Sequence, residues 1–137
     1  MCYNFKENIK SGLWTNIKVS EEVKKLLNEV NAYKGDDILS VAACLHALFE
    51  FIHPFADGNG RVGRTIMNYY LIINDEPPLV IYEEDKNRYY DALVCYDESE
   101  DLQPLLLFLK DQTVKTWQSR FLKEDQELYY KSRKFPY

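Results

Sequence analysis

The sequence predicts an all-α fold for a single domain, because apolar residues recur three and four positions apart over most of its length. Glycine and proline, five of each, stand mainly between these periodic segments. A hydrophobic content of 46% and a charged content of 28% are ordinary for a globular protein, and 137 residues suffice for one core. We therefore expect a compact helical domain of about five to seven helices, with a short β-hairpin near the N-terminus.

The N-terminal part of the chain is expected to differ from the rest. The stretch "LWTNIKVS" (Leu13–Ser20) alternates apolar and polar residues, which predicts a short extended segment or hairpin. Ser20 then resembles an N-cap, and Glu21 and Glu22 follow it in the first turn, where negative charge suits the helix dipole. The helix that begins there is expected to end near Gly35.

A second helix is predicted between Asp36 or Asp37, which can cap its start, and Pro54, which ends it. Its apolar face is sustained over about four turns. That face consists of Ile38, Val41, Ala42, Leu45, Leu48, Phe49 and Ile52. After a glycine-rich turn, a third helix is expected to begin at Arg61 or Val62 and to run to about Ile73.

The rest of the chain is predicted to form two more helices. Residues Leu79–Tyr82 form a brief extended piece, and Asp85 caps the helix that follows it. A longer helix begins after Asp101, with Pro104 in its first turn, and reaches about residue 121. The tail either extends that helix or frays. The organisation is one domain, with an N-terminal segment (1–19), a helical core (20–122) and a charged tail (123–137).

Composition and charge exclude some classes of partner. With a net charge of −5, direct binding to nucleic acid is not expected, and no apolar run is long enough to span a bilayer. The three cysteines, Cys2, Cys44 and Cys95, include no C-x-x-C pair. Cys44 lies in a helical apolar pattern and is expected in the core, so a reduced, cytoplasmic setting fits best.

The stretch "HPFADGNGRVGR" (residues 53–64) carries the chemistry. Gly58, Asn59 and Gly60 precede a helix whose first amides lack partners, so the turn is suited to hold phosphate. Arg61 and Arg64 lie three residues apart and can grip further phosphate oxygens, which indicates a di- or triphosphate.

Two other side chains of the stretch complete a transfer site. Asp57 is a candidate Mg²⁺ ligand beside the phosphates, and His53 is a candidate general base. Together these residues predict phosphoryl or nucleotidyl transfer. The stretch is not a P-loop, because it follows a helix and lacks the lysine of that motif.

At these residues the chain resembles the Fic family, whose signature H-P-F-x-[D/E]-G-N-G-R-x-x-R stands here complete. The similarity also takes in "LHALFEFIHPF" before the motif and "PPLVIYEEDKNRYYDAL" after it, about residues 19–117. The resemblance implies a Fic-type helical domain that transfers AMP from Mg·ATP to a Ser, Thr or Tyr hydroxyl of a target protein. The related Doc toxins carry Lys where this chain has Gly60.

The resemblance also implies a role for each motif residue. His53 would deprotonate the target hydroxyl, Asp57 would hold Mg²⁺, and Phe55 would be a buried anchor of the loop. The anion hole would be formed by Gly58, Asn59 and Gly60, and the arginines Arg61 and Arg64 would grip the β- and γ-phosphates.

Less specific signals concern the surroundings of the motif. The family's flap, which pairs with the target backbone, falls on Ile17, Lys18 and Val19. Tyr89 and Tyr90 are candidates to border the nucleotide base, although core packing is expected for at least one of them. His46 is expected to have a packing or capping role, and Asn68 a structural hydrogen bond.

Regulation and alternatives remain open on the sequence alone. The inhibitory [S/T]-x-x-x-E-[G/N] helix of the family is not found, which leaves a separate antitoxin-like partner, a fragment of a longer protein, or another form of regulation. Transfer of another nucleotide or of phosphocholine, or removal of AMP, would use the same site. A toxin-like or silent nucleotide-binding subunit is the alternative of another class. A bacterial source is expected, with action in a host cytosol if the protein is secreted.

Overall fold

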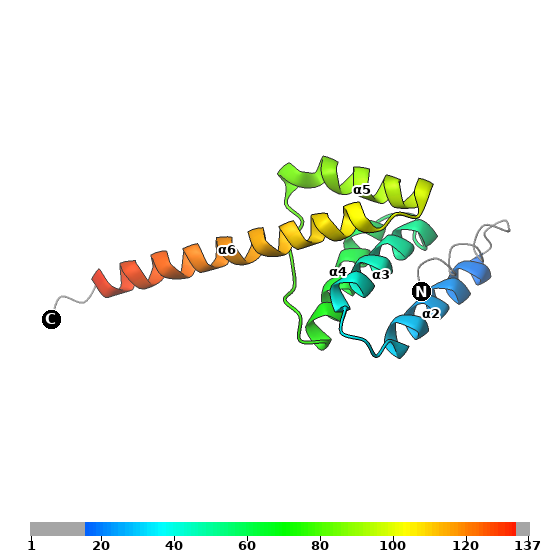
Figure 1. The fold of residues 1–137 in the computed structure, drawn as a ribbon, viewed down its shortest axis with the longest axis horizontal. Helices are drawn as coiled ribbons and strands as arrows, with labels where there is room; N and C mark the ends of the chain where they lie inside the picture. Colours follow the sequence, from blue (N-terminus) through cyan, green and yellow to red (C-terminus); the bar gives the residue numbers. More distant parts are fainter. Residues whose placement is uncertain (1–15, 134–137) are drawn as a thin grey trace.

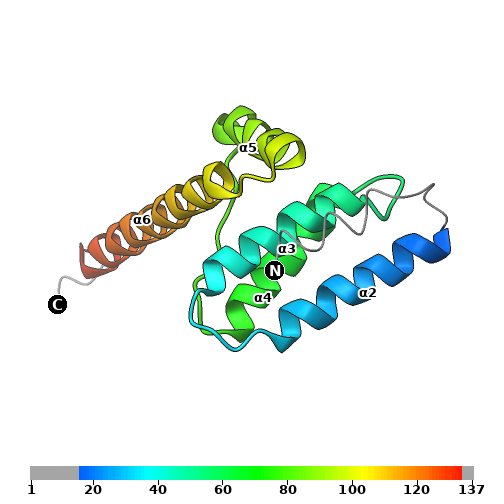
Figure 2. The same cartoon turned by 45° about the vertical axis from the view of Figure 1, so that its right-hand side comes forward.

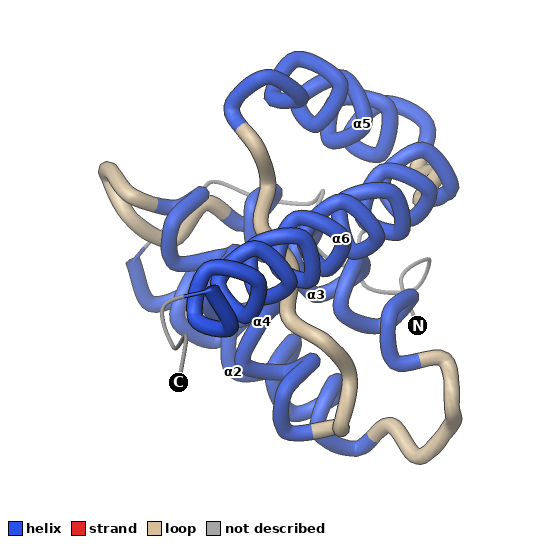
Figure 3. The backbone as a smooth tube through the Cα atoms, turned by 90° about the vertical axis from the view of Figure 1, so that its left-hand side faces the viewer, coloured by secondary structure: helices blue, strands red, loops and turns tan. Residues whose placement is uncertain are grey.

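The computed structural model describes residues 16–133, and every regular element in that range is a helix (Figures 1 and 3). The all-α prediction is confirmed. In order, the elements are α2 (Asn16–Ala32), α3 (Ile38–Ile52), α4 (Asn59–Ile73), the 3₁₀ turn η1 (Glu83–Asp85), α5 (Lys86–Ser99) and α6 (Gln103–Arg133).

Helix α3 is the centre of the domain. It packs against α2, α4, α5 and α6; Figure 2 shows α3 in front of α4, with α2 running alongside. Its hydrophobicity is nearly continuous, and the buried residues run from Val41 to Phe49 without interruption. The predicted N-cap is confirmed at Asp37, whose side chain accepts a hydrogen bond from Ser40 N at 3.3 Å. The helix ends at Ile52, before Pro54, as expected.

The prediction for the start of α2 is wrong. The helix already begins at Asn16, so Ile17, Lys18 and Val19 lie in its first turn rather than in an extended flap, and Ser20 is an exposed helical residue rather than an N-cap. The reason is that Val19 and Val23, one turn apart, both pack against the core. Helical periodicity therefore prevails over the short alternation. The rest of the predicted extended segment, residues 13–15, lies outside the described residues.

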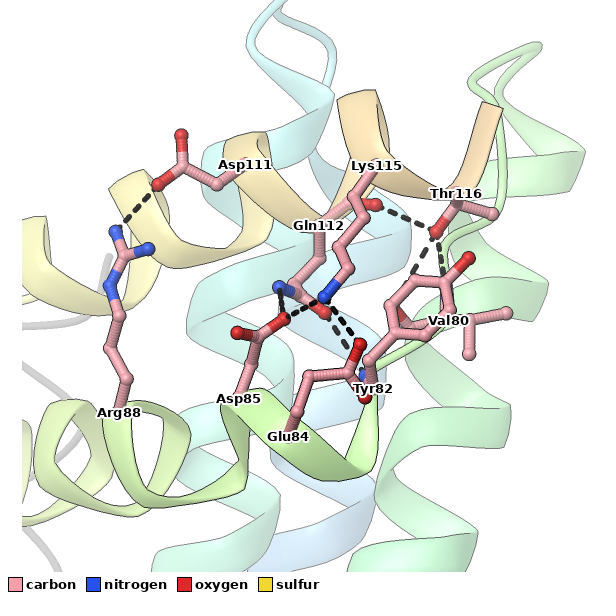
Figure 4. A network of polar contacts seen from close by, with 9 residues as sticks. All are labelled: Val80, Tyr82, Glu84, Asp85, Arg88, Asp111, Gln112, Lys115 and Thr116. Carbon is pink, nitrogen blue, oxygen red and sulfur yellow. Dashed lines mark hydrogen bonds and ion pairs between the residues drawn. The ribbon is translucent and has the colours of Figure 1, made fainter. Parts of the chain in front are cut away.

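The linker between α4 and η1 (residues 74–82) is partly extended, and within the described range it forms no β-sheet. Side chains bind its backbone instead (Figure 4). Asn68 donates to Leu79 O and accepts from Leu79 N, both at 2.9 Å, which confirms its predicted structural role. On α6, Thr116 accepts from Val80 N at 3.0 Å and Gln112 accepts from Tyr82 N at 3.0 Å. These side chains replace the sheet partner that an extended segment otherwise needs.

Helix α6 begins where predicted and, with 31 residues, is the longest helix of the described range. The Asp101 carboxylate accepts from Gln103 N at 3.0 Å at its start. The first half packs on α3 and α5, whereas the second half extends past the other helices (Figure 1). Of the two alternatives for the tail, the structure supports extension of the helix, as far as Arg133. No helix in residues 16–133 is long and apolar enough to cross a membrane.

The cysteines bear on the expected redox setting. Cys44 is buried in α3, as predicted. It is nevertheless disulfide-bonded, whereas Cys95 is a free thiol. The reduced, cytoplasmic setting stays a prediction.

Candidate active site

The motif forms the connection between α3 and the first turn of α4. His53 ends α3 in the left-handed region, with φ of 51°, and its backbone N–H donates to Phe49 O at 3.0 Å. Gly58 is left-handed as well, with φ of 81°, a conformation that glycine adopts without strain. These two residues turn the chain out of one helix and into the next.

Helix α4 begins at Asn59, two or three residues before the predicted start at Arg61 or Val62. Asn59 and Gly60 are therefore helical, and Gly58 is the one motif glycine with positive φ. The first intrahelical bond runs from Val62 N to Gly58 O at 3.0 Å. The amides of residues 59–61 precede it and have no partner within the helix, so the expected anion nest is the first turn of α4 itself.

Asn59 fixes the shape of the loop. Its side chain is buried, donates to Phe55 O at 2.7 Å and accepts from Phe55 N at 2.9 Å. Both polar atoms of the amide are thus used within the protein. Asn59 can offer a ligand its backbone amide, and its side chain acts as a latch.

Phe55 is not the buried anchor that the resemblance implied. Its side chain is 50% exposed, and its ring lies 6.4 Å from that of Phe49. The loop does not need a buried ring here, because the Asn59 amide already holds the Phe55 backbone.

The predicted chemical residues meet in one cavity of about 520 Å³. That size suits a nucleotide, since small-molecule sites measure about 300–1,000 Å³. From the motif, its lining includes His53, Asp57, Gly58, Asn59, Gly60, Arg61 and Arg64. Residues from outside the motif also line it, namely Glu50 from α3 and Lys86 and Tyr90 from α5.

The two tyrosines proposed to border the base have different positions. Tyr90 is half-exposed and lines the cavity. Tyr89 is 2% exposed and belongs to the core, where its hydroxyl lies 2.6 Å from His46 Nε2. Core packing of one of the pair was expected, and the structure identifies Tyr89 as that residue.

A buried polar pair, His46 and Tyr89, lies next to the cavity. Burial lowers the pKa of His46 to about 4, with a smaller contribution from Arg64 and opposition from the Gly63 backbone. The His46 ring therefore remains neutral at pH 7, and the packing role predicted for it is confirmed. Burial raises the pKa of the Tyr89 hydroxyl. The nearby Glu50 carboxylate raises this pKa further, whereas Arg64 lowers it.

Glu50 is an acidic group inside this cationic site. Burial raises the pKa of its carboxyl, while His53 and Arg64 oppose that shift. Its Oε1 is buried and makes no hydrogen bond among the described residues. Sequence reasoning missed Glu50, although it stands three residues before His53 on the same helix. Lys86 was missed as well; its signal is the four-residue spacing from Tyr90.

Asp57 has the character expected of a single metal ligand. It is exposed at the rim of the cavity, and its Oδ1 accepts from Gly58 N at 2.7 Å. The described residues contain no cluster of three or more His, Cys, Asp or Glu side chains that would hold a metal alone. One carboxylate beside a phosphate nest suits Mg²⁺, which takes one or two carboxylates together with substrate phosphates.

Comparison with known proteins agrees with the resemblance to the Fic family that the motif indicates. The model of the Fic/DOC family matches residues 4–71, about half of the chain. The chain is 40% identical over 75 residues to "Protein adenylyltransferase Fic" of Aedes aegypti, covering 55% of this chain and 15% of that protein. Proteins of the same name from Drosophila yakuba and Drosophila melanogaster are 40% and 38% identical over 78 residues, covering 57% of this chain and 16% of each protein.

The chain thus spans about one sixth of the length of the curated relatives it matches. These relatives are insect proteins, so they lend no support to the bacterial source expected from the sequence.

Proposed function

Because the chain belongs to the Fic family, we propose that it transfers AMP from Mg·ATP to the hydroxyl of a Ser, Thr or Tyr side chain in a target protein. Pyrophosphate is released. The observation that carries this proposal is the meeting of His53, Asp57, Arg61, Arg64 and the first turn of α4 in one cavity of nucleotide size. A base, a metal ligand and an anion-binding helix end are the groups that nucleotidyl transfer needs.

In the proposed step, His53 accepts the proton of the target hydroxyl. The hydroxyl oxygen forms a bond to the α-phosphorus of ATP, and the bond from that phosphorus to the bridging oxygen breaks. AMP remains on the target and pyrophosphate leaves. Arg61, Arg64 and the free amides of α4 balance the charge of the leaving phosphates. Asp57 would hold Mg²⁺, which neutralises phosphate charge when bound.

The proposal is tested by incubating the protein and a lysate with ATP labelled on either the α- or the γ-phosphate. Label transferred to protein from the α-position alone, and abolished by EDTA, is the expected result. Transfer from the γ-position alone would refute AMP transfer and indicate a kinase. A preference for UTP or CDP-choline under the same conditions would reassign the substrate.

A His53→Ala variant separates chemistry from binding. Loss of a general base typically slows a reaction by about 10²–10⁴-fold. His53 is exposed and lies outside the first turn of α4, so calorimetry should show that the variant still binds Mg·ATP. Full transfer activity in this variant would remove His53 as the base. The antitoxin-like inhibitor stays a prediction, to be tested by co-purification from the source cell.

A further inference from the structure

The wall of the cavity that faces the motif is formed by α5. Lys86 and Tyr90 stand one turn apart on that helix, and both line the cavity. Lys86 therefore brings a third cation to a site in which the motif supplies Arg61 and Arg64.

A second, smaller cavity of about 90 Å³ adjoins this wall. It shares two residues with the main cavity, Arg64 and Lys86, and both of these are cationic. Since one water occupies about 30 Å³ of liquid, the small cavity holds a few waters or one oxyanion group, but not a nucleoside. Arg64 and Lys86 thus lie at the boundary between the nucleotide-sized cavity and one that has room for a single phosphate.

Of the three acidic residues before Lys86, Glu83 lines the small cavity, whereas Glu84 and Asp85 pair with α6. Glu84 and Asp85 accept from Lys115 Nζ of α6 at 2.8 and 2.7 Å, and Asp85 also accepts from Gln112 at 2.8 Å (Figure 4). The hydrogen bonds to Lys115 lower the pKa of both carboxyls, so both are ionised and paired at pH 7. The network also fixes the start of α5, at the residue next to Lys86.

Glu83 is the acidic residue that pairs with Lys86. The distance from Lys86 Nζ to Glu83 Oε1 is 3.2 Å, and the two side chains are 44% and 84% exposed. Exposed pairs of this kind contribute little to stability because water screens them. A phosphate with two negative charges can therefore compete for the Lys86 ammonium.

From these observations we propose that Lys86 is a specificity-determining residue, which binds the terminal phosphate of a nucleoside triphosphate beside Arg64. The inference rests on the proposed function, since it assumes that the main cavity holds the nucleotide. It adds that a residue of α5, outside the motif, contacts the terminal phosphate, which only a triphosphate has. The protein should then distinguish triphosphate from diphosphate through Lys86.

Calorimetry with Mg·ATP, Mg·ADP and AMP tests this assignment on the wild type and three variants. Lys86→Gln should weaken Mg·ATP about tenfold, as expected for one charge-assisted contact, weaken Mg·ADP less than threefold and leave AMP unchanged. Lys86→Arg keeps the charge and should restore most of the ATP affinity. Lys110→Gln neutralises an exposed lysine of α6 that does not line either cavity, and should change nothing.

Two results would overturn the assignment while leaving AMP transfer intact. One is an unchanged ATP affinity in Lys86→Gln. The other is an equal loss for ATP and ADP, which would indicate a general effect on the wall. If the wild type binds none of the three nucleotides, the proposed function fails and this assignment fails with it. Circular dichroism should confirm that the Lys86→Gln variant remains folded.

Discussion

Replacing His46 by Gln should flatten the dependence of folding stability on pH between 6.5 and 4. His46 is fully buried, and its pKa falls from an ordinary value of 6.5 to about 4 in the folded protein. In the unfolded chain the His46 ring takes up a proton near pH 6.5, whereas in the folded protein it takes up a proton only near pH 4. The unfolded state therefore binds more protons in this window, so stability is present above pH 6.5 and is lost as the pH falls.

The size of the effect follows from the shift. A difference of about 2.5 pKa units at 1.36 kcal/mol per unit gives about 3 kcal/mol between pH 7 and pH 4. Gln does not titrate, and its amide can still form a hydrogen bond with the Tyr89 hydroxyl that now lies 2.6 Å from the ring. The variant should thus lose about 3 kcal/mol less than the wild type on acidification.

The assay is urea unfolding at pH 7, 6, 5 and 4, followed by circular dichroism. Other groups titrate in this range, and Glu50 acts with the opposite sign. Its raised pKa gives stability that is lost as the pH rises. Wild type and variant share these groups, so the difference between the two curves reports His46. Parallel curves would refute a buried, neutral His46.

Three further substitutions test the supports of the site by chemical denaturation. Asn59→Ala should cost about 2 kcal/mol, because both hydrogen bonds to the Phe55 backbone are lost, and it should weaken Mg·ATP binding; unchanged affinity would show that the loop holds without its latch. Gly63→Ala should cost about 1 kcal/mol of stability, because the added Cβ would lie 3.1 Å from His46 Nδ1. Helix propensity alone favours alanine over glycine, so a gain in stability would contradict this reasoning. Gln112→Leu should cost about 2 kcal/mol by leaving a linker amide without its partner; a neutral result would mean that water replaces the side chain.

The fold could be predicted where a single local rule decides the outcome. Asp37 and Pro54 delimit α3 in the sequence as they do in the structure, because capping and the missing amide of proline act within a few residues. The start of α2 could not be predicted in this way. Whether Val19 belongs to a strand or a helix depends on its packing against the core, which the alternation of neighbouring residues does not report.

The site shows the same division. His53, Asp57, Arg61 and Arg64 stand close together in one stretch, so the sequence alone predicts that they converge. Other contributions depend on distant segments. Lys86 reaches the cavity because α6 fixes the start of α5. Tyr89 is buried in the core, where its hydroxyl lies 2.6 Å from His46 Nε2. Neither relation leaves a local pattern in the chain.

Helix α3 connects the stability of the protein with its chemistry. His46, Glu50 and His53 follow one another at four and three residues, so they lie along one face of this helix. The first is buried against Tyr89, the second stands at the boundary of core and cavity, and the third ends the helix at the candidate catalytic position. A rotation of α3 that relieved the buried histidine would also move the base. The pH at which His46 becomes charged should therefore set the acid limit for an intact site.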